Sequence, residues 1–103
     1  MSFFICHVYG DNERDPPLDS LEHLYAEKDV GDDDHFGVSV IHETEWCLTL
    51  LSSNTLIWEN LEAGDNPQHM KNVPKDKVLD LWSNLARGDI TTVDAEPWLE
   101  GYY

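Results

Sequence analysis

The chain has little positive charge. Six lysines and arginines stand against 21 aspartates and glutamates, which gives a formal net charge of −15 over 103 residues. A surface this negative repels nucleic-acid phosphates and anionic membranes. The sequence therefore predicts no binding to nucleic acid or to membranes, and it favours association with a basic protein.

Long apolar runs and cysteines are scarce as well. Nothing approaches the roughly 20 apolar residues that span a bilayer, and the apolar segment 3–9 lacks the preceding basic stretch of a signal peptide. The two cysteines, Cys6 and Cys47, both fall in predicted strands, where free thiols indicate a reducing compartment. We predict a cytoplasmic protein with a single domain over residues 1–103.

The usual signatures of catalysis are absent. The chain has no glycine-rich phosphate loop, no paired-cysteine motif and no serine elbow. His7 and His42 could meet across a sheet, but the histidines lack the spacing of a zinc site. Cys6 or Cys47 could be combined with His42 and Glu43, yet a reactive thiol needs electropositive surroundings. We predict no enzyme activity, no metal and no cofactor, with a small metal-dependent or thiol enzyme as an alternative.

What the chain does have is a run of three strand-like segments, at residues 36–43, 46–51 and 55–61. In the first, Phe36, Val38 and Val40 alternate with polar positions, which is the two-residue period of a half-buried strand. The connectors are short enough for hairpins. The region therefore predicts a three-stranded antiparallel meander.

Two amphipathic helices flank this meander. Asp15 and two prolines open the first helix, and Pro74 opens the second, which ends at Gly88. The apolar stripes of the helices comprise Leu18, Leu21, Leu24 and Tyr25 in the first, and Val78, Leu81, Trp82 and Leu85 in the second.

The remaining segments complete the fold. We expect residues 3–9 to form a strand inside the sheet, residues 10–17 a loop, residues 68–73 a short edge strand and residues 90–103 a tail against the body. The predicted fold class is α+β: a single antiparallel sheet of four to five strands with two helices packed on one face, in the order β-α-β-β-β-(β)-α-tail.

Acidic residues gather in two loops, residues 11–15 and 29–34. The second loop lacks the ligand spacing of a calcium-binding EF-hand, so we interpret both loops as solvated or as contacts for a partner. Tryptophans and tyrosines set among carboxylates are suited to anchor such a contact. The predicted partner-binding residues are Asp11, Glu13, Asp15, Asp32, Asp33, Asp34, Glu43, Glu45, Glu59, Glu62, Trp98 and Tyr102.

In composition and architecture the chain resembles the small acidic immunity proteins with which bacteria block nuclease toxins. The resemblance implies a basic protein partner whose cleft is covered, with no chemistry by this chain. The alternative is a structural or regulatory domain whose charge serves solubility only.

Overall fold

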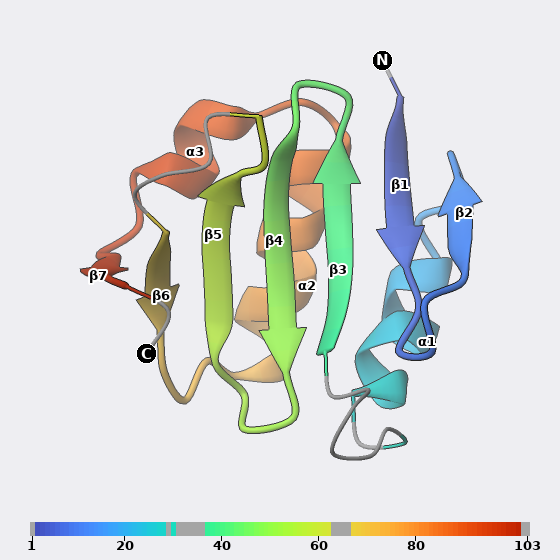
Figure 1. The fold of residues 1–103 in the computed structure, drawn as a ribbon, viewed down its shortest axis with the longest axis horizontal. Coiled ribbons are helices and arrows are strands. Elements are labelled where there is room, and N and C mark those ends of the chain that lie inside the picture. The colour runs from blue at the N-terminus through green and yellow to red at the C-terminus, as the bar shows by residue number, and fades with distance from the viewer. Residues whose placement is uncertain (1, 29, 31–36, 63–66, 102–103) are drawn as a thin grey trace.

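The computed structural model describes residues 2–28, 30, 37–62 and 67–101. These residues form one antiparallel sheet in the order β2-β1-β3-β4-β5-β6-β7, with helices behind it (Figure 1). The elements are β1 (Phe3–Cys6), β2 (Asn12–Arg14), α1 (Ser20–Glu27), β3 (Gly37–His42), β4 (Trp46–Leu51), β5 (Leu56–Asn60), β6 (Gln68–Met70), α2 (Lys75–Ala86), α3 (Ile90–Asp94) and β7 (Leu99–Glu100). The α+β class is confirmed, but the sheet has more strands than predicted.

The central meander is confirmed. β3, β4 and β5 pair in sequence, with Val40 opposite Leu48 and Leu48 opposite Trp58. Both connecting turns place one residue in the left-handed region, Glu45 at φ 73° and Asn54 at φ 64°. Phe36, which we expected to begin the first of these strands, lies outside the described residues.

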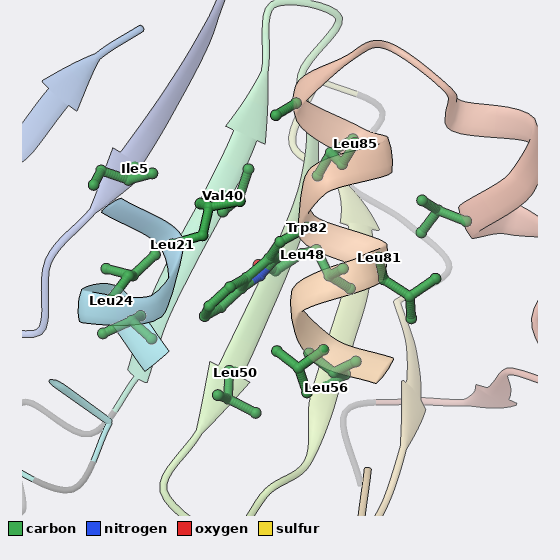
Figure 2. Packing of buried hydrophobic residues seen from close by; sticks show 14 of the residues in the cluster. Ile5, Leu21, Leu24, Val40, Leu48, Leu50, Leu56, Leu81, Trp82 and Leu85 are labelled. Carbon is green, nitrogen blue, oxygen red and sulfur yellow. The ribbon is translucent and has the colours of Figure 1, made fainter. Parts of the chain in front are cut away.

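Alternation along these strands builds a core on one side of the sheet only. Val38, Val40, Leu48, Leu50, Leu56 and Trp58 share that side and are fully buried. Leu21 and Leu24 from α1, together with Leu81 and Leu85 from α2, pack against them (Figure 2). Both predicted helices therefore cover the same face, as expected.

α2 follows its prediction closely. Pro74 precedes its first residue, and Gly88 beyond its end takes a positive φ of 83°. Trp82 is fully buried at the centre of the core, and its indole N–H donates to the Leu48 carbonyl at 3.0 Å. This hydrogen bond joins the helix to the middle strand of the sheet.

α1 begins later than predicted. The carboxylate of Asp15 accepts a hydrogen bond from the Phe3 N–H at 2.9 Å, and the Asp15 N–H donates to the Phe3 carbonyl at 2.8 Å. Asp15 is therefore committed to β1 and cannot cap a helix. The helix starts at Ser20, and Leu18 is exposed.

β2 lies within the segment predicted to be a loop. Its three residues are polar and exposed, so no apolar period marks them. Pairing with β1 alone defines this edge strand. β1 is correspondingly interior, as expected, but it ends at Cys6 and not at Tyr9, and Phe4 and Cys6 are only half-buried.

The C-terminal tail packs against the body, as expected, but it is ordered into α3 and β7. Val93 of α3 is fully buried in the core. β7 pairs with β6, so β6 is not the edge strand that we predicted. With only two residues, β7 is too short to show a strand period in the sequence.

Candidate protein-binding surface

Four of the predicted acidic residues meet at one end of the sheet, and we call Asp15, Glu43, Glu45 and Glu62 the acidic end. Backbone hydrogen bonds place them in a row: Asp15 pairs with Phe3, and the Glu43 N–H donates to the Ser2 carbonyl at 2.9 Å. Further along the row, the Glu45 carbonyl accepts from the Leu61 N–H at 2.9 Å. All four are exposed. In Figure 1 the N-terminal end of β1, the β3–β4 turn and the end of β5 lie together at the top.

The sheet face turned away from the helices adjoins the acidic end. Register places Phe4, Ile41, Cys47 and Glu59 in one row across four strands. The next row contains Ser39, Thr49, Ile57 and His69. We call these eight residues the open face. No helix in the described part of the chain covers it, because both long helices pack on the opposite side (Figure 1).

Much of the open face is apolar and set close to the sheet. Cys47 and Ile57 are each only 4% exposed although they lie outside the main core. The hydroxyls of Ser39 and Thr49 bond to each other at 2.8 Å, and the Thr49 hydroxyl also lies 3.4 Å from the Cys47 sulfur. The apolar residues of this face that remain partly exposed are therefore Phe4 and Ile41.

Glu59 is the exception on this face. It is half-buried in the row that contains Cys47, and its negative charge helps to raise the pKa of the Cys47 thiol. Among the residues that the structure describes, none donates a hydrogen bond to the Glu59 carboxylate and none forms an ion pair with it. A half-buried carboxylate without a cation gains from a partner that supplies one.

Three tryptophans stack on the helix side of the sheet. The rings of Trp46 and Trp58 lie 4.5 Å apart, and those of Trp58 and Trp98 lie 6.0 Å apart. The Trp58 indole N–H donates to Asp94 at 3.0 Å, and that of Trp98 donates to the Val93 carbonyl at 2.8 Å. Trp98, predicted as a binding anchor, is therefore half-buried and fixed by packing.

Replacing Asp94 with alanine is expected to destabilise this stack. Trp58 is fully buried and its N–H would lose its partner, but Asp94 is exposed, so water can replace part of the bond. We expect the free energy of unfolding to fall by about 1 kcal/mol. Urea denaturation of Asp94→Ala measures the loss, and the neighbouring exposed substitution Thr91→Ala serves as the control, with little effect expected.

The other predicted binding residues do not join this surface. The turn that contains Asp11 lies at the opposite end of β1 from Asp15, and Glu13 pairs with His7 on the edge strand. The predicted acidic loop of residues 11–15 is thus divided between two ends of the sheet. Asp32, Asp33, Asp34 and Tyr102 lie outside the described residues.

Three lysines lie at the end of the sheet opposite the acidic end. The Nζ atoms of Lys28 and Lys75 are 5.1 and 5.5 Å from the centre of the Tyr25 ring. Lys28 follows the end of α1 and Lys75 begins α2, and both places lie at the bottom of Figure 1, as does the chain after β6 that carries Lys71. Charge is mixed at both ends, because Asp11 and Glu27 share the lysine end and Arg14 lies 3.8 Å from the Asp15 carboxylate.

Cys6, Cys47 and His42 lie on three different strands of the described sheet. β3 lies between the strands of Cys6 and Cys47, and both thiols are free. Burial raises the pKa of both, that of Cys47 to about 11, which disfavours the reactive thiolate. His42 pairs with Phe3 whereas His7 follows the other end of β1, so these two histidines, which could have met across the sheet, lie apart.

In the described residues, no three histidine, cysteine, aspartate or glutamate side chains come together in a way that could hold a metal ion. None of the described helices has the length and apolar character needed to cross a membrane.

The open-face residues Ile41 and Ile57 were missed at the level of sequence. The signal that would have found them is the loss of strict alternation, since Val40-Ile41 and Ile57-Trp58 are consecutive apolar pairs. Such pairs place apolar side chains on both faces of a strand.

Comparisons with protein-family models, curated proteins and solved structures found nothing that matches this chain.

Proposed function

We propose that this protein is a small acidic binding module that docks on a basic protein through the open face and the adjoining acidic end. The observation that carries the proposal is the Glu59 carboxylate, half-buried among apolar neighbours with no cation from the described residues. A lysine or arginine of a partner would complete this site, and aliphatic side chains around it would cover the partly exposed Ile41.

Charge supports the same partner. The net charge of −15 opposes self-association and contact with other acidic surfaces. At the acidic end, the exposed carboxylates would attract a cationic protein over roughly one Debye length, about 8–10 Å in physiological salt. This attraction speeds encounter, whereas the buried contacts on the open face hold the complex.

The proposed role is inhibition by coverage. A basic nuclease has a cationic cleft for its substrate, and a protein seated over that cleft blocks access without any chemistry of its own. This role is the one performed by the acidic immunity proteins that the chain resembles in composition. Two free cysteines with raised pKa fit the reducing cytoplasm in which we place the protein.

The proposal predicts selective binding that survives moderate salt. We would titrate the protein calorimetrically with three basic proteins, pancreatic ribonuclease A, lysozyme and cytochrome c, at about 20 mM and about 150 mM NaCl. We expect at least one complex to keep measurable affinity at the higher salt, because apolar contacts are not screened.

A domain whose charge serves solubility only would show a different salt dependence of binding. If the charge serves solubility only, the three proteins will bind equally weakly at low salt and none will bind at about 150 mM. Inhibition assays with the ribonuclease test the coverage step separately, since binding away from the catalytic cleft would leave its activity unchanged.

A further inference from the structure

A single histidine joins three elements at the opposite end of the sheet. His7, directly after β1, lies between two carboxylates: its Nδ1 is 2.6 Å from Glu27 Oε2, and its Nε2 is 2.6 Å from Glu13 Oε1. Glu27 is the last residue of α1, and Glu13 is the middle residue of β2. The imidazole therefore links the β1–β2 hairpin to the first helix.

These two contacts require a particular protonation state. A carboxylate can only accept hydrogen bonds, and a neutral imidazole carries one N–H and one unprotonated nitrogen. Only the doubly protonated imidazolium can donate to Glu13 and Glu27 at the same time. Partial burial alone would lower the pKa of His7, but the hydrogen bonds and charges of Glu27 and Glu13 outweigh it and raise the pKa above its ordinary value.

We propose that His7, Glu13 and Glu27 form a pH-dependent clamp, which fastens the β1–β2 hairpin to α1 when the imidazole is charged and releases Glu13 when it is neutral. The clamp is independent of the proposed docking surface, because its three residues lie outside both the acidic end and the open face.

The two carboxylates are not equivalent in this clamp. The second oxygen of Glu27 accepts from the Val8 N–H at 3.3 Å, and the Glu27 side chain is 27% exposed against 51% for Glu13. The remaining proton of a neutral ring therefore stays on Nδ1, facing Glu27. The lone pair of Nε2 then faces the Glu13 carboxylate at hydrogen-bond distance, and repulsion moves Glu13 into solvent.

Other ionisable groups surround the clamp without replacing it. Asp11 accepts the His7 backbone N–H through its carbonyl, and the Tyr9 hydroxyl donates to the Val30 carbonyl at 3.2 Å, beyond the end of α1. Cys6 precedes the histidine, and Lys28 follows Glu27 and lies over the Tyr25 ring. With Glu13 released, β2 is held by its backbone pairing to β1 and by the Arg14 guanidinium, which lies 5.8 Å from the centre of the Phe4 ring.

Nitrogen-resolved NMR of the histidine rings tests the clamp. We would follow both ring nitrogens of His7 from about pH 5.5 to about pH 9 in the wild type, Glu13→Gln and Glu27→Gln. Each substitution is expected to lower the His7 midpoint by roughly half a unit to one unit, since it removes one negative partner. The matched control is Glu22→Gln on the exposed face of α1, where we expect no change.

The wild type also supplies readouts that need no substitution. In alkaline solution its neutral His7 should be protonated on Nδ1. The protection factors of the β2 amides, which correct for the base-catalysed rise in intrinsic exchange, should be lower there than near pH 6. A midpoint that is the same in Glu13→Gln and wild type, or a neutral ring protonated on Nε2, would overturn the proposal.

The clamp also predicts how the stability of the protein changes with pH. Because the pKa of His7 is raised in the folded state, the stabilisation is fully present below the unfolded value of about 6.5 and is lost as pH rises through the folded pKa. The wild type should therefore exceed Glu13→Gln in stability near pH 6, and the difference should shrink towards pH 9. A constant difference would contradict the clamp.

Discussion

Replacing Trp82 with alanine is expected to lower the free energy of unfolding by about 3–5 kcal/mol. Trp82 is fully buried where α2 crosses the sheet, and it is among the largest buried side chains (Figure 2). Its removal leaves a cavity between Val40, Leu48 and Leu81 and deprives the Leu48 carbonyl of a donor. A domain of this size has a total stability of about 5–15 kcal/mol, so the loss is a large share of it.

Urea denaturation followed by circular dichroism measures this effect, with an expected fall in midpoint of roughly 2 M. Trp82→Phe is the informative control, because it keeps most of the ring and loses the indole N–H. We expect Trp82→Phe to lower the free energy of unfolding by about 1–2 kcal/mol. A loss below about 1 kcal/mol for Trp82→Ala would mean that α2 does not pack on β4 through this residue.

Segments with a strong apolar period were predictable from the sequence. α2 shows a clear helical stripe and a glycine stop, and β3 to β5 show alternation with short connectors, so their positions followed from local pattern. The single-sided core follows as well, because alternating strands have one apolar side to cover. Those elements account for most of the buried residues.

The edge strands were not predictable by the same reasoning. β2 and β7 are short, their described side chains are exposed, and only pairing defines them. β2 pairs with β1, which directly precedes it, and β7 pairs with β6, which is distant in the chain. Asp15 illustrates a second limit: its sequence context is that of a helix cap, yet tertiary contact with Phe3 takes up its carboxylate. Local propensity cannot show which of two partners a polar side chain will choose.

The candidate surface was predictable only in part. Glu43, Glu45, Glu59 and Glu62 were identified by charge, and chain order placed them near the meander. The separation of Asp11 from Asp15 and the orientation of Glu59 depend on strand direction and register, which composition does not encode.

Reversing charge at the acidic end is expected to abolish docking. We would replace Glu43, Glu45 and Glu62 with lysine and compare the protein with a matched variant carrying lysine at Glu22, Asp80 and Glu100. All six positions are exposed. Each reversal adds two positive charges, so both triple variants change from −15 to −9 and differ only in where the charge is placed.

The two triple variants should differ in affinity because their lysines lie at different distances from the bound partner. Placing a lysine against a cationic partner costs several kcal/mol, whereas a lysine distant from the contact alters only the screened long-range field. At about 150 mM NaCl we expect the acidic-end variant to lose at least roughly 100-fold in affinity and the matched variant to lose less than roughly fivefold. Circular dichroism of both variants checks that they remain folded.

The most direct measurement is therefore the ratio of these two dissociation constants for whichever basic protein binds the wild type most tightly. A dissociation constant at least roughly 20 times larger for the acidic-end variant than for the matched variant is the predicted result. Equal losses in the two variants would show that net charge alone governs association, and would contradict docking through the acidic end.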